Sequence, residues 1–70
     1  MNDMVLNVNG TPRTIEAATV ADLMVELGFE RNAPGIAAAL NGAVLPQTEW
    51  GSTKLGDGDS IDIIHAVQGG

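Results

Sequence analysis

The stretch Ser60-Ile61-Asp62-Ile63-Ile64-His65-Ala66-Val67 is the clearest β-strand in this 70-residue sequence. Successive side chains of a strand point to opposite faces, so Ile61 and Ile63 share one face and Ile64 lies on the other. We expect Ile61 and Ile63 to pack against a helix. Ile64 and Ala66 then lie on the open face of the sheet, where adjoining apolar side chains, with Val5 if the first strand lies alongside, would form a binding surface.

A first β-hairpin is predicted near the N-terminus. Met4–Val8 alternates apolar and other residues, as a half-buried strand does. Asn9-Gly10 favours a type I′ turn, and Arg13–Glu16 forms the returning strand. Pro12 has no N–H to donate, so it places this returning strand at an edge of the sheet.

A second hairpin and a short helical turn are predicted in the middle of the chain. Asn41-Gly42 separates the strand Ile36–Leu40 from the strand Ala43–Leu45. Pro46 ends the second of these strands, and residues 48–50 are expected to form a short helical turn. Trp50 in this turn is expected to close one end of the core.

One amphipathic helix is predicted between the two hairpins. Thr19 and Asp22 have the spacing of an N-terminal capping box, with Asp in place of the usual Glu. The apolar positions at helical spacing are Val20, Leu23, Met24 and Leu27. Gly28 suits a left-handed C-terminal cap, and residues 29–35 are expected to form a polar connection.

The predicted order of elements is strand, strand, helix, strand, strand, strand. A single helix against such a sheet defines an α+β domain, with the helix packed on a mixed sheet of four to five strands. We expect residues 1–70 to form one domain with a flexible tail at residues 68–70. The face of the sheet without a helix is left to solvent or to a partner.

Composition and charge narrow the classes of function. The sequence has 3 Lys and Arg against 9 Asp and Glu, a net charge of −6, which disfavours binding to nucleic acid or to anionic membranes. It has no cysteine, hence no thiolate metal site, and this fits the reducing cytoplasm. No signal peptide or membrane-spanning stretch is recognisable, and Met1–Asp3 is expected to be disordered. We therefore expect a soluble cytoplasmic protein.

The polar residues that resemble catalytic or metal-binding sites favour structural roles. Asp57 and Asp59 lack the remaining ligands of a calcium loop, so we expect their carboxylates to accept hydrogen bonds from nearby backbone N–H groups. His65 has no recognisable orienting partner or nucleophile and is expected at the solvent-exposed end of the helix-covered face. The sequence predicts neither a catalytic residue nor a metal site.

The C-terminal residues Gln68-Gly69-Gly70 carry the strongest functional signal. The last two residues have no side chain, so an extended tail of this kind can pass through a narrow slot in another protein. Its terminal carboxylate is ionised at pH 7 and becomes reactive once a partner activates it. The alternative is an ordinary frayed terminus.

Several motifs together resemble those of one family. They are Val8-Asn9-Gly10, Ala39-Leu40-Asn41-Gly42, Val44-Leu45-Pro46, Glu49-Trp50 and the whole stretch from Gly58 to Gly70. Through them the chain closely resembles the ThiS family, the sulfur carrier proteins of thiamine biosynthesis, which have the ubiquitin-like β-grasp fold. One departure is Gln47, because many members of that family have Arg after the preceding proline.

The resemblance implies a carrier and not an enzyme. A separate adenylating enzyme, similar to ubiquitin-activating enzymes, would use ATP and magnesium to adenylate the Gly70 carboxylate. A sulfur donor such as a cysteine desulfurase would convert the adenylate to a thiocarboxylate, and thiazole synthase would take the sulfur. Val67, Gln68 and Gly69 would enter the partner's channel, while Asp62, Ile64 and Ala66 would contact its surface. The carrier itself would bind no cofactor or metal.

Three alternatives remain open at this point. The small subunit of molybdopterin synthase shares the fold and the Gly-Gly end but is usually longer. A carrier that supplies another sulfur metabolite would have a similar sequence. A ubiquitin-like modifier would instead form isopeptide bonds with lysines. The sequence leaves the sulfur donor and the oligomeric state undetermined.

Overall fold

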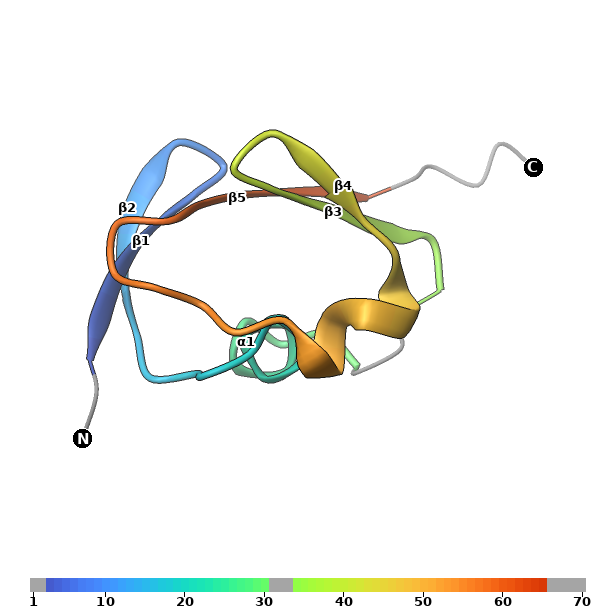
Figure 1. Cartoon of the computed structure of the whole chain (residues 1–70), viewed down its shortest axis with the longest axis horizontal. Helices are drawn as coiled ribbons and strands as arrows, with labels where there is room; N and C mark the ends of the chain where they lie inside the picture. The colour runs from blue at the N-terminus through green and yellow to red at the C-terminus, as the bar shows by residue number, and fades with distance from the viewer. Residues whose placement is uncertain (1–2, 31–33, 66–70) are drawn as a thin grey trace.

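The computed structural model describes residues 3–30 and 34–65, which form a five-stranded sheet with one helix against one face (Figure 1). The elements are β1 (Met4–Val8), β2 (Thr11–Ile15), α1 (Val20–Glu26), β3 (Ile36–Leu40), β4 (Ala43–Leu45), the 3₁₀ helix η1 (Gln47–Ser52) and β5 (Ser60–His65). The strand order is β2-β1-β5-β3-β4. β5 is parallel to β1 and antiparallel to β3, so the predicted mixed sheet is confirmed and the last strand of the chain lies at its centre.

Both hairpins turn on an Asn-Gly pair, as predicted. The φ angles are 51° and 82° in Asn9-Gly10, and 50° and 88° in Asn41-Gly42, the left-handed values that a type I′ turn requires. Each asparagine also bonds to β5. The Asn9 Oδ1 accepts from the Ile63 N–H at 2.7 Å, and the Asn41 Oδ1 accepts from the Ser60 N–H at 2.9 Å. The two turns therefore hold the central strand from both sides.

The strand β2 begins earlier than the sequence suggests. Arg13–Glu16 was the predicted range, but the two-residue turn places Thr11 directly opposite Val8, so pairing starts at once. β2 is an edge strand, which confirms the position inferred from Pro12. Glu16 lies beyond the strand.

The predicted ends of α1 are confirmed by hydrogen bonds. At the N-terminus the Thr19 side chain accepts from the Asp22 N–H at 3.2 Å. At the C-terminus Gly28 has a φ of 98°, and the next N–H, that of Phe29, donates to the Met24 carbonyl at 2.8 Å. This is the bonding of a Schellman motif, in which the residue after the glycine turns back onto the helix.

The core lies between the sheet and α1, and η1 covers one end of it (Figure 1). Its buried apolar residues are Leu6, Val8, Ile15, Ala17, Val20, Ala21, Leu23, Met24, Ile36, Ala38, Trp50, Leu55 and Ile61. Trp50 is only 1% exposed, and its Nε1 donates to the Leu45 carbonyl at 3.1 Å. The buried indole is thus packed and hydrogen-bonded, which confirms its role in closing the core.

Candidate functional site

The open face of β5 carries two of the predicted interface residues. Ile64 is 57% exposed and Asp62 is also exposed, whereas Ile61 is completely buried on the face that packs against the core. The alternation expected along this strand is confirmed. Ala66, the third predicted interface residue, lies outside the described residues.

Neighbouring strands extend the apolar surface around Ile64. In the antiparallel register Ala37 of β3 lies opposite Ile64, and Ala39 lies opposite Asp62. On the far side of Ala39 is Val44 of β4, which is 80% exposed. Ile64, Ala37, Ala39 and Val44 together form what we term the open-face patch.

The expectation that Val5 would join this patch is wrong. β1 does lie alongside β5, but the parallel register pairs Asn7 with Ser60. Val5 precedes Asn7 by two residues, and Ile64 follows Ser60 by four. Six residues of strand separate the two side chains by about 20 Å. The open-face patch therefore extends from β5 across β3 to β4 and does not reach β1. β5 is the central strand and pairs with both β1 and β3.

The residues of the predicted tail lie beyond the described part of the chain. Val67, Gln68, Gly69 and Gly70 all follow His65, the last described residue of β5, so their roles remain predictions. Five residues extended from this point span at most about 18 Å. The open-face patch lies at the base of the tail, because Ile64 immediately precedes His65.

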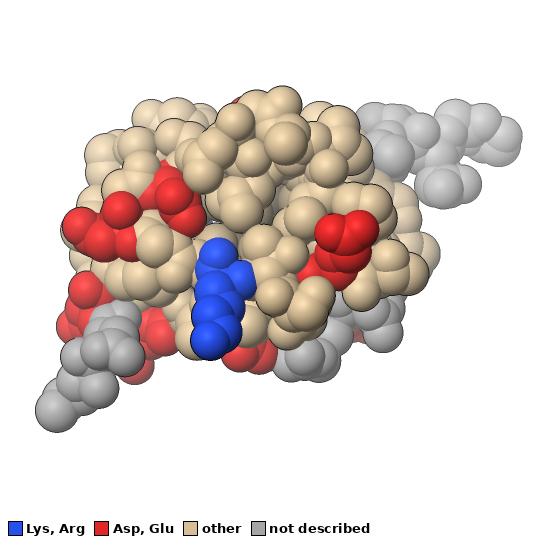
Figure 2. Space-filling view, viewed as in Figure 1, with Lys and Arg blue, Asp and Glu red and all other residues tan. Residues whose placement is uncertain are grey.

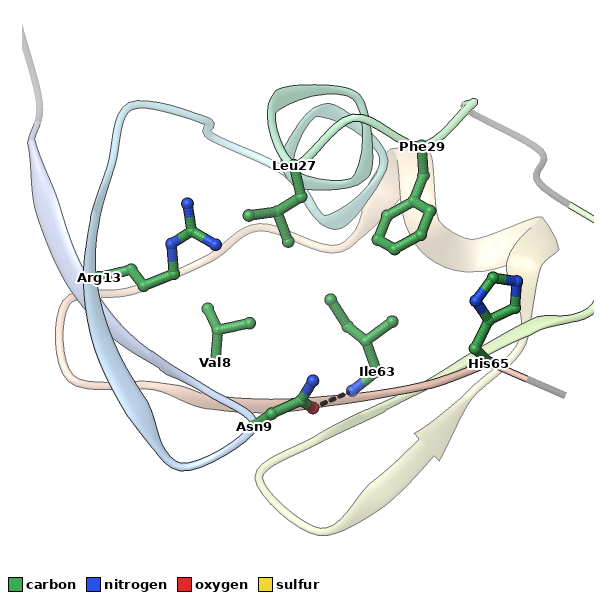
Figure 3. Close-up of a pocket in the computed structure, with 7 residues that line it drawn as sticks. All are labelled: Val8, Asn9, Arg13, Leu27, Phe29, Ile63 and His65. Carbon is green, nitrogen blue, oxygen red and sulfur yellow. Dashed lines mark hydrogen bonds between the residues drawn. The ribbon is translucent and has the colours of Figure 1, made fainter.

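A cleft opens on the opposite, helix-covered side of β5, near the C-terminal end of α1. It has a volume of about 270 Å³, and the residues that line it are Val8, Asn9, Arg13, Leu27, Phe29, Ile63 and His65 (Figure 3). We call it the α1 cleft. The rings of His65 and Phe29 meet edge to face with their centroids 6.2 Å apart. His65 is exposed and lies on the helix-covered side, which confirms its predicted position at the solvent-exposed end of that face.

Two residues of the α1 cleft have no role in the sequence-based prediction. Phe29 belongs to the connection predicted to be polar, yet it packs against the core. The position of Phe29 directly after Gly28 could have indicated this packing, because the residue after the glycine of a Schellman motif commonly makes an apolar contact with the helix. Arg13 could have been placed on the same side because it alternates with the buried Ile15 along β2.

The acidic turn before β5 has a structural role. The Asp59 Oδ2 accepts from the Gly56 N–H at 2.8 Å, the local bond that the sequence predicts. The Asp57 Oδ1 instead accepts from the Val5 N–H at 2.8 Å, so the expectation of a local partner is wrong for Asp57. Its carboxylate ties the turn to β1, which local sequence could not show. No three potential metal ligands cluster among residues 3–30 and 34–65.

Gln47 uses its side-chain amide within the fold. Its Nε2 donates to the carbonyl of Ile36, the first residue of β3, at 3.1 Å. This bond anchors the start of η1 to the sheet. Gln47, the departure from the family pattern noted in the sequence, is therefore bonded to its own chain.

The surface agrees with the acidic composition. In the view of Figure 2, acidic side chains lie to the left, to the right and just below one small basic area. Neither of the two helical segments in the described part of the chain has the length and apolar character needed to span a membrane.

Sequence comparison relates almost the whole chain to known proteins. The profile of the ThiS family matches residues 6–70. A curated sulfur carrier protein ThiS from Thermus thermophilus is 33% identical over 63 residues, which cover 90% of this chain and 95% of that protein. A thiazole synthase from Magnetococcus marinus is 32% identical over 68 residues, which cover 96% of this chain but only 20% of the synthase.

Structural comparison gives the same relationship. The crystal structure of a thiamine biosynthesis protein, ThiS, from Geobacter metallireducens superposes with a TM-score of 0.79 at 33% identity and covers 96% of this chain and 100% of that one. A solution structure of a thiamine biosynthesis protein from the same organism gives a TM-score of 0.77 at 31% identity, with coverage of 96% and 88%. The β-grasp fold expected from the sequence is thus confirmed.

Proposed function

The chain belongs to the ThiS family, and from this membership we propose that it is a sulfur carrier of thiamine biosynthesis whose Gly70 carboxylate is adenylated and then converted to a thiocarboxylate. The observation that carries the proposal is the extent of the family match, which runs through the terminal Gly69-Gly70 to residue 70. The absence of cysteine is consistent with it, because the chain has no thiol that could carry the sulfur instead.

The proposed chemistry takes place at the Gly70 carboxylate. One carboxylate oxygen attacks the α-phosphate of ATP, an acyl–phosphate bond forms and pyrophosphate leaves. The terminal sulfur of a donor persulfide, such as that of a cysteine desulfurase, then attacks the acyl carbon, and the bond from this carbon to the AMP oxygen breaks. A thiol of the donor or of the adenylating enzyme cleaves the resulting acyl disulfide, which releases the thiocarboxylate and leaves a disulfide on that protein. ATP and magnesium belong to the adenylating enzyme, while this chain contributes a tail without bulky side chains at its end. The carrier would work in the cytoplasm.

We propose thiazole synthase as the protein that takes the sulfur. A stretch of the M. marinus thiazole synthase matches 96% of this chain, so a carrier-like segment and a synthase occur there in one polypeptide. The open-face patch is the surface that we assign to partners, with Ile64 at the side nearest the tail and Asp62 beside it. It is apolar and lies at the base of the tail, so a partner that receives Gly70 also covers Ile64.

Intact mass spectrometry tests the proposal. The chain is co-expressed with the adenylating enzyme and a sulfur donor, and the expected product has one oxygen replaced by sulfur at the C-terminus. Deleting Gly70, or adding one residue after it, should abolish this product and leave the melting temperature nearly unchanged. Loss of folding on deletion would show that these residues are structural and would contradict the carrier mechanism.

A second reaction separates the sulfur pathways. The same thiocarboxylate sample is offered to thiazole synthase, with a deoxyxylulose phosphate substrate and a glycine-derived imine, and to the large subunit of molybdopterin synthase. Thiazole formation without dithiolene formation is expected. The reverse result would assign the chain to molybdopterin synthesis, and high-molecular-weight conjugates in cell lysate would indicate a protein modifier.

A further inference from the structure

β5 has a free main-chain edge beside the α1 cleft. The Asn9 N–H donates to the Ile61 carbonyl at 3.0 Å, and the Ile63 N–H donates to the Asn9 side chain at 2.7 Å, so both Ile61 and Ile63 point backbone groups toward β1. Every second residue of a strand points its backbone groups to the same side, so the His65 N–H also faces this way. β1 has already turned away at Asn9, and within residues 3–30 and 34–65 no group bonds to that N–H from this side.

The α1 cleft adds side-chain recognition to this edge. Its walls are mainly apolar, with Leu27 and Phe29 opposite Ile63. Figure 3 shows the Arg13 side chain extending from β2 toward the helix side of the cleft. Arg13 is exposed and forms no ion pair with any residue of the described ranges. An apolar cavity with an unpaired cation at its rim fits an apolar side chain that has a carboxylate nearby.

We propose that an extended segment of thiazole synthase adds to this edge as a strand, with its backbone bonded to the His65 N–H, an apolar side chain in the α1 cleft and a carboxylate beside Arg13. The inference rests on the proposed function and specifies how the recipient holds the base of the tail. Strand addition supplies affinity through main-chain bonds, and the cleft supplies specificity.

Two features favour a segment of the tail's recipient over other occupants. The free edge is continuous with the tail, which begins immediately after His65, and with the open-face patch on the other face of β5. His65 precedes Gly70 by five residues, so a protein that receives Gly70 has this edge within about 18 Å of the bound carboxylate. A second copy of the chain is disfavoured, because each copy has a net charge of −6.

Amide hydrogen exchange measured by NMR tests the backbone contact. In the free protein the His65 amide should exchange faster than the Ile63 amide, which is already bonded to Asn9. Saturating thiazole synthase should slow exchange at His65 by about tenfold or more and leave Ile63 nearly unchanged. If wild-type protein binds the synthase and exchange at His65 stays fast, the strand addition is wrong.

A pair of charge reversals tests the cleft contact. Arg13→Glu and Lys54→Glu change the net charge equally, but Lys54 does not line the cleft. It lies opposite Thr19 at the N-terminal end of α1, whereas the cleft lies at the C-terminal end of that helix. Arg13→Glu should weaken the binding of thiazole synthase about tenfold, and Lys54→Glu by no more than about twofold. If both variants weaken synthase binding equally while the wild-type protein still yields thiazole, this inference is wrong and the proposed function stands. Failure of the wild-type protein both to bind the synthase and to yield thiazole would overturn the proposed function and this inference with it.

Discussion

Ile61 and Ile64 are the same residue type on the same strand, yet they differ completely in environment. Ile61 is fully buried against the core, whereas Ile64 is 57% exposed on the open face. The first stabilises the fold by removing apolar surface from water. The second leaves that surface available, so its burial can stabilise a complex. One face of the central strand thus stabilises the fold, and the other is left exposed for the partner contact proposed above.

Truncating each isoleucine tests most directly whether the two side chains differ in this way. Ile61→Ala should lower the free energy of unfolding by about 2 to 5 kcal/mol, because it leaves a cavity in a small core. Ile64→Ala should change it by less than about 0.5 kcal/mol. Urea denaturation monitored by the buried Trp50 measures both. Similar losses for the two variants would show that the open face is covered in the folded monomer.

A charge on the open face should affect binding and not folding. Ile64→Asp should weaken binding of a tail-accepting partner by about 2 kcal/mol, because the partner's apolar surface would have to desolvate a carboxylate. Val5→Asp is the matched control, since Val5 is 49% exposed on the same face but lies at the other end of the sheet. Calorimetric titration gives both affinities. Equal losses would indicate a general effect of acidic charge.

The asparagines on the two sides of β5 should also differ in how much they stabilise the fold. Asn9 and Asn41 have nearly equal φ angles, so an alanine at either position incurs a similar backbone cost. The Asn41 side chain makes a second bond, from its Nδ2 to the Asp59 carboxylate at 3.2 Å. Asn41→Ala should therefore destabilise the protein by about 1 kcal/mol more than Asn9→Ala in thermal unfolding. The opposite order would show that the bond to Ile63 is the stronger restraint.

The smallest effect is expected for the carboxylate beside the open-face patch. Asp62→Asn should slow association with a partner of basic character by about twofold at low salt, and the difference should vanish near 1 M salt. Glu49→Gln changes the net charge equally from a position in η1, away from this patch. Stopped-flow measurements that give the same rates for both variants would show that only net charge matters.

Local sequence predicts the elements of this fold well. Each Asn-Gly turn, the Thr19 cap and the Gly28 cap specify their backbone conformation within a few residues, and all of them are confirmed. The register between distant strands has no such local signal. Alternation shows on which face a side chain lies but not where it lies along the neighbouring strand. The expected contact between Val5 and Ile64 is wrong for this reason.

The candidate site was only partly predictable for the same reason. Alternation along β5 placed Ile64 and Asp62 correctly. Val44 could not be assigned to the patch, because β4 reaches it only through the pairing of β3 with β5. The α1 cleft brings β2, the end of α1 and β5 together, and no segment of the sequence contains that combination.

The two Asn-Gly turns also bear on how the protein ages. Asparagine followed by glycine is the sequence most prone to deamidation, in which the glycine nitrogen attacks the side-chain amide and a carboxylate eventually replaces it. The consequences would be unequal. At Asn9 a carboxylate could still accept the Ile63 N–H, but at Asn41 it would face the Asp59 carboxylate across what is now a 3.2 Å hydrogen bond. Chemical damage at the second turn would therefore loosen the start of the central strand, while the same damage at the first would leave its hold on β5 largely in place.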